Sequence, residues 1–313
     1  MVVVKRAPAY HPGRRVSSAS RRRAPDRTLR VGAVRGLQYS PMTDANVAAI
    51  AREMLDAYAT GKSISVPPSA RDGGFDLDAG YAVEAEIARQ RRAAGRNTVG
   101  RKLGLGNRAV WKTLNLKTLV WASMYDDTVQ YAKNGRGSVS VGMMRAPKIE
   151  PEIAVKLKSV PAAATAEAAI EASEWIALAF EIVDCPYPEW KFQGGDFMAS
   201  LGLHAALLVG EPRAVRPGEA AQLIERLGAF TATLTKNGEV AQQGGGKNVL
   251  DNPALCLAEF VSALPQQKFT EPLRAGEIIT TGSLTPAPLV SAGEQWRVEA
   301  SGLDVAPLTV DLT

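Results

Sequence analysis

Residues 175–183 form a nearly continuous apolar run that contains a single carboxylate, Glu181. A run of this length and composition is typical of a strand that is buried on both faces. A carboxylate inside such a strand is costly unless it pairs with a cation or binds a metal ion. The chain must therefore fold around a buried site that neutralises Glu181, either an ion pair with Lys102 or an arginine, or a metal ion.

A second segment, residues 148–157, supplies two more carboxylates. Its odd-numbered positions from 149 to 157 are apolar and share one face of a predicted strand, whereas Glu150 and Glu152 share the other. Two strand rises place those two carboxylates about 6–7 Å apart, where like charges repel unless something positive lies between them. One interpretation is a solvated outer face beside the flanking lysines. The other joins both residues to Glu181 in an oxygen-rich pocket suited to Mg²⁺ or Mn²⁺.

Two further segments carry groups suited to such a pocket. Lys102 lies between two glycines, Gly100 and Gly104, which allow a backbone or a ligand to approach closely. A partly desolvated lysine near a metal is expected to have a lowered pKa suited to proton transfer, although an exposed strand lysine is equally common. The loop at 282–286 offers two hydroxyls, Ser283 and Thr285, and free backbone donors for a substrate carboxylate, a signal that is weak alone.

The charge of the chain is unevenly distributed. Ten of its 37 basic residues and one of its 32 acidic residues lie in residues 1–41, so this segment carries +9, the remainder carries −4, and the whole chain has a net charge of +5. A mildly acidic body gives no reason to expect nucleic-acid binding. No apolar run approaches the roughly 18 residues of a membrane span. Two cysteines and two histidines exclude a disulfide scaffold and a four-cysteine zinc site.

Residues 1–41 show no apolar period and are expected to be a disordered basic tail. Three interpretations fit this segment: an organellar transit peptide, a loose polyanion-binding arm, or upstream sequence translated in error. We favour the last interpretation, because Met42 is followed directly by Thr43 and Asp44, a good helix N-cap pair.

The rest of the chain predicts a single catalytic domain over 42–313, with a helical cap at 42–97 and a β-rich metal-binding core at 98–313. Apolar spacing and capping residues predict helices at about 44–60 and 76–92. From residue 98 short strands broken by glycine dominate, with helices near 163–174, 217–227 and 253–264. Period-two alternation near the C-terminus predicts strands around 278–279, 289–290, 296–298 and 305–310. The fold class is therefore α+β.

Five motifs occur in the order and rough spacing of a known family. They are VGRKLGL at 99–105, an acidic pair at 126–127, IEPEIA at 149–154, FEIVDC at 180–185 and GSLTPAP at 282–288. In these motifs the chain, over about 42–311, resembles the 2-keto-4-pentenoate hydratase group of the fumarylacetoacetate hydrolase superfamily. The resemblance implies a mainly β roll or barrel of the fumarylacetoacetate hydrolase C-terminal type, with a small helical N-terminal part.

The resemblance also implies roles for individual residues. Glu150, Glu152 and Glu181 match the carboxylates that bind Mg²⁺ or Mn²⁺, and Lys102 matches the lysine assigned to proton transfer. Lys102, Asp126, Ser283 and Thr285 are then expected to contact the substrate.

The chain departs from the family pattern at several positions. It has Ala199-Ser200-Leu201 where relatives often carry Ala-Asp-Asn, and Ala122 where the family has a glycine, so the exact substrate stays open. The superfamily's hydrolases use a histidine–glutamate pair to activate water. His204, the only histidine in 42–313, lies in an apolar stretch typical of a packed core histidine, which disfavours hydrolysis of a carbon–carbon bond.

These observations predict a metal-dependent lyase that adds water to a small 2-hydroxy-dienoate or 2-oxo-enoate. A 4-oxalocrotonate decarboxylase is the near alternative, because the same dienolate chemistry supports loss of carbon dioxide from a 2-oxo-dioic acid. The resemblance further implies a cytoplasmic homo-oligomer that associates with a partner enzyme of the same pathway, without nucleic-acid or membrane partners.

Rival interpretations come from glycine-rich segments. Residues 104–109 fit a relaxed dinucleotide fingerprint, and Asp126 lies 20 residues beyond Gly106, which would suit an NAD(P)-dependent reductase. Residues 244–247 are not a P-loop, because Ala241 replaces its first glycine and Asn248 its Ser or Thr. A non-catalytic oligomeric binding module is a third interpretation, and metal dependence separates the lyase from both rivals.

Overall fold

The structure is a computed structural model that describes residues 43–313, so the basic tail expected at 1–41 lies outside the described residues. The helices are α1 (Asp44–Thr60), α2 (Leu77–Ala93), α3 (Arg108–Trp111), α4 (Ala166–Glu171), α5 (Gly194–Ala199), α6 (Ala220–Ala229) and α7 (Pro253–Ala263). The strands are β1 (Thr98–Gly104), β2 (Val120–Tyr125), β3 (Val129–Tyr131), β4 (Arg136–Val139), β5 (Lys148–Leu157), β6 (Ser173–Val183), β7 (His204–Val209), β8 (Arg213–Ala214), β9 (Thr231–Lys236), β10 (Glu239–Gly245), β11 (Ile278–Ser283), β12 (Gln295–Ser301) and β13 (Leu308–Leu312).

Local capping residues set the ends of the two long helices. The Thr43 side chain accepts a hydrogen bond from the Asn46 N–H at the start of α1, and Gly61 ends this helix in the left-handed region, with φ 69°. The Asp76 side chain caps α2 in the same way through the N–H of Ala79. The predictions of helices at 44–60 and 76–92 are therefore confirmed.

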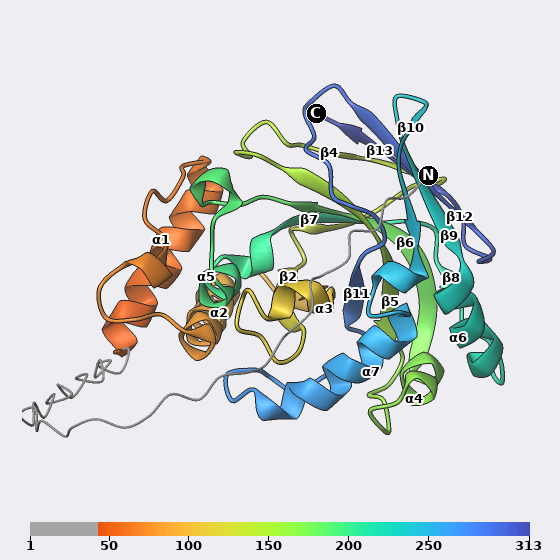
Figure 1. Cartoon of the computed structure of the whole chain (residues 1–313), viewed down its shortest axis with the longest axis horizontal. Coiled ribbons are helices and arrows are strands. Elements are labelled where there is room, and N and C mark those ends of the chain that lie inside the picture. The colour runs from red at the N-terminus through yellow and green to blue at the C-terminus, as the bar shows by residue number, and fades with distance from the viewer. Residues whose placement is uncertain (1–42) are drawn as a thin grey trace, which may run out of the picture. The chain divides into compact units, whose positions relative to one another are not determined.

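The strands form two sheets (Figure 1). The eight-stranded sheet has the order β2-β1-β11-β5-β6-β7-β3, with β8 beside β6, and the five-stranded sheet has the order β10-β9-β12-β13-β4. The sheets touch where β4 lies against β7: a Cβ on Gly137 of β4 would come within 2.5 Å of the Leu208 side chain. The expected α+β fold with a mainly β body is confirmed.

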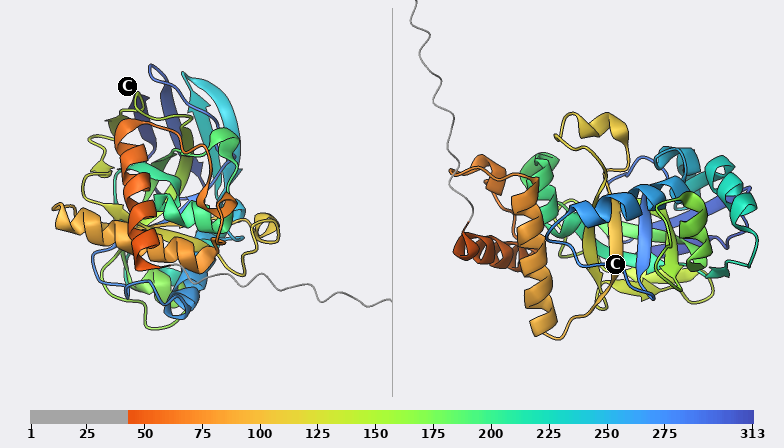
Figure 2. Two further views of the ribbon diagram at one scale, coloured as in Figure 1. Left: turned by 90° about the vertical axis from the view of Figure 1, so that its left-hand side faces the viewer. Right: turned by 90° about the horizontal axis from the view of Figure 1, so that it is seen from below.

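The helices gather in two groups around the sheets. Figure 1 shows α1, α2 and α5 together at one side and α4, α6 and α7 along another, and Figure 2 shows α1 crossing α2. Helices α2 and α5 approach so closely that a Cβ on Gly80 would lie 2.4 Å from the Gly195 carbonyl oxygen. The Arg145 guanidinium ties α1 to the strands by donating to the Ala57 carbonyl at 2.8 Å. Among residues 43–313, every helix is too short or too polar to cross a bilayer.

The structure differs from the sequence predictions in a few elements. Leu289 and Val290 do not form a strand: Leu289 makes only an isolated bridge to Lys148, and Pro286 and Pro288 remove the N–H groups that a ladder needs. Helix α4 covers Ala166–Glu171 and is shorter than the predicted 163–174. Helices α3 and α5 are too short to show a helical period in the sequence.

Candidate metal centre

The pairing of β5 with β6 brings the three glutamates together. Glu150 lies directly opposite Glu181 in this antiparallel pair, and Ser283 of β11 is opposite Glu152 on the other edge of β5. Directly opposed side chains have Cβ atoms about 4.5–5.5 Å apart. One carboxylate oxygen from each of Glu150, Glu152 and Glu181 lies within 4.8 Å of the others. The oxygen-rich pocket considered from the sequence therefore exists as an arrangement of side chains.

The burial of these acids suits a cation. Glu152 and Glu181 have no exposed surface, and Glu150 is partly buried. Glu152 Oε2 accepts a hydrogen bond from the Gly282 N–H at 2.8 Å, while its Oε1 has no hydrogen-bond partner among residues 43–313. A buried, unpartnered carboxylate oxygen calls for an ion or a water. An all-oxygen donor set of this kind fits Mg²⁺ or Mn²⁺.

Lys102 reaches the same pocket from β1. Its Nζ lies 3.0 Å from Glu181 Oε2, and its side chain is 3% exposed. It also donates a hydrogen bond to the Gly202 carbonyl at 3.1 Å. The ion pair with Lys102, considered as the simple alternative for Glu181, is therefore present, and it coexists with the carboxylate cluster.

An unusual turn presents the Gly202 carbonyl to Lys102. Leu201, Gly202 and Leu203 all have positive φ, at 58°, 61° and 63°. A non-glycine residue in the left-handed region costs about 1–2 kcal/mol. Surrounding packing must hold the two leucines there, since both are buried. This turn contains Leu201, where the chain departs from the Ala-Asp-Asn pattern of the family.

The buried charges shift one another's pKa values. Burial raises the pKa of Glu150 to about 7, although Lys102 opposes the shift. Burial, with Glu181 and Glu150 adding to it, raises the pKa of Glu152 well above its ordinary value. Burial also acts to raise the pKa of Glu181, but Lys102 and His204 outweigh it and the pKa is lowered. Glu150 and Glu152 therefore favour the protonated form until a cation takes the place of the protons.

The pKa of Lys102 is shifted by the carboxylates that surround its ammonium. Burial acts to lower the pKa, but the charges of Glu181, Glu150 and Glu152 outweigh it, and the pKa is raised. The lowered pKa expected from the sequence requires a metal ion beside Lys102, and it stays a prediction.

A cavity of about 740 Å³ opens at this cluster. Lys102 and Glu150 line one part of it, and the aromatic side chains of Trp190, Phe192 and Phe197 line another. Ser283 and Thr285 also line it. The Ser283 hydroxyl donates to the Thr285 carbonyl at 2.8 Å, and the Thr285 hydroxyl donates to the Pro286 carbonyl at 3.1 Å. The loop predicted to contact substrate therefore borders the cavity.

Asp126, which was expected to contact the substrate, does not join this group. It is exposed in the turn after β2, where its carboxylate accepts hydrogen bonds from the Asn97 N–H at 3.1 Å and side-chain amide at 3.0 Å. Thr98 pairs with Tyr125 at this end of the sheet, so Asp126 is about four strand rises, or 13 Å, from Lys102.

The dinucleotide fingerprint also lacks its structural context. Residues 104–109 lead from β1 into the four-residue helix α3, and β1 pairs antiparallel with the next strand, β2. A dinucleotide fingerprint belongs to a βαβ unit, in which a long helix follows the glycines and a parallel strand follows the helix.

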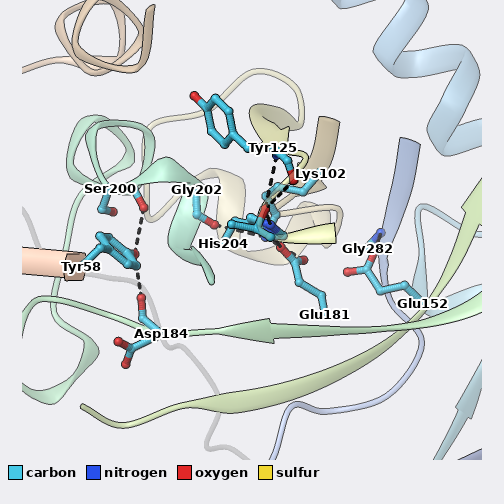
Figure 3. A network of polar contacts seen from close by, with 11 residues as sticks. Tyr58, Lys102, Tyr125, Glu152, Glu181, Asp184, Ser200, Gly202, His204 and Gly282 are labelled. Carbon is cyan, nitrogen blue, oxygen red and sulfur yellow. Dashed lines mark hydrogen bonds and ion pairs between the residues drawn. The ribbon is translucent and has the colours of Figure 1, made fainter. Parts of the chain in front are cut away.

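The sequence did not reveal that His204 contacts Glu181 (Figure 3). Its Nδ1 lies 2.8 Å from Glu181 Oε1, and its Nε2 lies 2.9 Å from the Thr128 hydroxyl. The prediction of a buried histidine is confirmed, but its ring contacts a carboxylate of the cluster. The register of β6 and β7 produces this contact, since Val183 pairs with His204 two residues from Glu181.

Comparisons with known proteins agree with this fold. Residues 123–310 match the fumarylacetoacetate (FAA) hydrolase C-terminal family, and the chain belongs to that family. Within it, the chain is 30% identical over 253 residues to 2-keto-4-pentenoate hydratase 1 of Dechloromonas aromatica (strain RCB), covering 79% of this chain and 90% of that protein. It is 28% identical to the 4-oxalocrotonate decarboxylase of Pseudomonas sp. (strain CF600), covering 71% and 81%.

A solved structure shares the fold. The 4-oxalocrotonate decarboxylase from Pseudomonas putida G7, complexed with magnesium and adipate, superposes with a TM-score of 0.77 at 24% identity. The match covers 87% of this chain and 98% of that one.

Proposed function

We propose that this protein is a divalent-metal-dependent hydro-lyase that adds water to a small 2-hydroxy-dienoate or 2-oxo-enoate. Glu150, Glu152 and Glu181 would hold Mg²⁺ or Mn²⁺, and Lys102 would transfer the proton. The observation that carries the proposal is the cluster itself: three carboxylate oxygens within 4.8 Å, one buried oxygen of Glu152 without a partner, and an ammonium 3.0 Å from Glu181. The family relatives named as hydratases support the same activity.

The residues around the cavity have complementary tasks in this reaction. A bound divalent cation supplies positive charge for the negative charge that develops on the oxygens of a 2-oxo acid. Lys102 is held by Glu181 and the Gly202 carbonyl, which leaves one of the three ammonium hydrogens for the substrate. The loop with Ser283 and Thr285 borders Glu152 and would bind the substrate carboxylate. The aromatic wall would accommodate the apolar diene.

A 4-oxalocrotonate decarboxylase-like activity is the second candidate, and one observation favours it. Lys247, in the segment that resembled a P-loop only superficially, lines the same cavity. It forms no ion pair with another residue of 43–313, so its charge is free to bind a second carboxylate. A 2-oxo-dioic acid has such a group, and a 2-hydroxy-dienoate with one carboxylate does not. The relative named as a decarboxylase supports this candidate.

One assay separates the two activities. The purified chain, loaded with Mg²⁺ or Mn²⁺, is given 2-hydroxypenta-2,4-dienoate or a 2-oxo-enedioate, and loss of the diene absorbance and release of carbon dioxide are followed. Hydration of the monoacid supports the first candidate, and carbon dioxide from the dioic acid supports the second. In the second case Lys247→Met should raise KM for the dioic acid alone. Failure to turn over either substrate with metal present contradicts both.

The family resemblance supports further proposals about domain organisation, location and assembly. We propose that residues 42–97 act as a cap on the 98–313 core, that the protein is a cytoplasmic homo-oligomer, and that it associates with an enzyme of the same pathway. Sedimentation velocity tests the oligomer directly, and a monomer at micromolar concentration would contradict it.

A further inference from the structure

His204 is buried between the carboxylate cluster and the turn that joins β2 to β3. Figure 3 shows Lys102 and His204 converging on Glu181, with Glu152 and Gly282 beside them. The two side chains contact different oxygens: Lys102 Nζ lies 3.0 Å from Oε2, and His204 Nδ1 lies 2.8 Å from Oε1. Glu181 is therefore held at both ends of its carboxylate.

Hydrogen-bond accounting shows where the ring proton must be. Glu181 pairs with the Lys102 ammonium through Oε2, and an ionised carboxylate only accepts hydrogen bonds, so the contact at Oε1 needs a hydrogen on His204 Nδ1. The Thr128 hydroxyl lies 2.9 Å from Nε2 and 3.1 Å from the Tyr125 carbonyl, and it accepts a hydrogen bond from the Tyr125 N–H at 3.3 Å. Its single hydrogen can point to Nε2 or to the carbonyl. In both cases the hydrogen on Nδ1 is required.

The turn at 201–204 also separates two cavities. Gly202 and Leu203 line the cavity with the carboxylates, whereas Leu201 and His204 line a second one, also of about 740 Å³, beside α1 and α2. Removing the imidazole would open a path between the cavities and would admit water to Glu181. A test of His204 therefore uses polar amide side chains, which fill part of the space of the ring, rather than alanine.

We propose that His204 is a positioning residue that, through its Nδ1–H, turns Oε1 of Glu181 toward β7 and leaves Oε2 facing Lys102. This inference rests on the proposed metal-binding role of Glu181 and adds a residue that acts through it. Partners that orient a metal ligand in this way typically change metal affinity by about 10–100-fold when they are removed.

Two substitutions separate the two ring nitrogens. In His204→Asn the side-chain amide N–H takes the place of Nδ1–H, and in His204→Gln the amide takes the place of Nε2 and keeps only the contact to Thr128. Mn²⁺ affinity, measured by calorimetry, should stay close to wild type in His204→Asn and should fall by about 10–100-fold in His204→Gln. Equal affinities in the two variants, or an affinity in His204→Gln equal to wild type, would overturn the proposal.

A second measurement needs no variant of His204. The chain has two histidines, His11 and His204, so His11→Gln assigns the ring signals of His204 in a ¹⁵N NMR spectrum of the metal-free protein. We expect a protonated Nδ1, and an unprotonated Nδ1 would overturn the inference even if the variants failed to fold. If wild type binds no Mn²⁺ while Nδ1 is protonated, the proposed function fails and the hydrogen bond to Glu181 stands.

Discussion

Replacing Lys102 by methionine removes the ammonium group and keeps most of the side chain's apolar volume. The ammonium lies 3.0 Å from Glu181 Oε2, and neither side chain is more than 3% exposed. Removing one partner of a buried ion pair destabilises a protein by about 3–5 kcal/mol, because the other charge remains buried without compensation. We therefore expect metal-free Lys102→Met to lose about 3–5 kcal/mol of unfolding free energy.

The loss should depend on metal and on pH. Bound Mn²⁺ would restore positive charge beside Glu181, so the difference from wild type should shrink in its presence. In wild type Lys102 helps to hold the pKa of Glu181 below its ordinary value, so this carboxylate stays charged at both pH 5 and pH 8. In the variant the burial of Glu181 is no longer opposed by Lys102, so its pKa should rise and the carboxyl can take up a proton at pH 5. The difference between variant and wild type should therefore be larger at pH 8 than at pH 5. Urea unfolding in EDTA and in Mn²⁺, at both pH values, measures it.

Activity gives the second part of this prediction. Loss of the proton-transfer group should lower kcat by about 10²–10⁴, with Mn²⁺ affinity retained. Lys156→Met is a matched control, because Lys156 makes a surface ion pair with Glu174 that is worth about 0–1 kcal/mol. An unchanged kcat with a raised KM would make Lys102 a carboxylate anchor. Unchanged metal-free stability would refute the argument from the buried ion pair.

Three further predictions follow from the same region. Because burial raises the pKa of Glu150 from 4.5 to about 7, the metal-free fold should lose stability as the pH rises through this interval. For the same reason Mn²⁺ binding at pH 7 should release protons, and calorimetry in two buffers measures that release. In Gly202→Ala the new Cβ would lie 2.9 Å from Lys102 Cδ at a φ of 61°, so kcat should fall while Mn²⁺ affinity is retained. Arg145→Met should cost about 3–5 kcal/mol in urea unfolding, because Arg145 forms a buried ion pair with Asp184.

The features that could be predicted from the sequence have local signals. Helices α1 and α2 end within a residue or two of their predicted positions, because Thr43, Asp76 and Gly61 act on the turns next to them. The carboxylate cluster follows from two strand patterns, the alternation around Glu150 and Glu152 and the apolar run around Glu181. Once those strands are adjacent, the acids face the same interior.

The features that could not be predicted depend on distant parts of the chain. The contact between His204 and Glu181 needs the register of β6 against β7, which no local pattern specifies. The left-handed turn at Leu201 is formed by a residue that normally avoids that conformation, so tertiary packing overrides its local preference. The direction of the Lys102 pKa shift is a sum over three carboxylates on two strands.

Glu152→Gln tests the metal site more cleanly than Glu181→Gln. Glu181→Gln would disturb Lys102 and His204 as well as a metal ion, because Glu181 contacts both. Glu152 forms no ion pair with another residue of 43–313, and its raised pKa favours the protonated form, which glutamine imitates. In Glu152→Gln the metal-free fold should therefore keep the stability of wild type.

The most direct test of the metal centre is thus a calorimetric titration of Mn²⁺ into wild type and into Glu152→Gln, with unfolding of both proteins in EDTA. We predict that wild type binds one Mn²⁺ per chain. The affinity of the variant should be at least tenfold lower, because a charged ligand is lost, and the two metal-free proteins should be equally stable. Equal Mn²⁺ affinity in the two proteins, or no binding to wild type, would contradict the assignment of Glu150, Glu152 and Glu181 as a metal site.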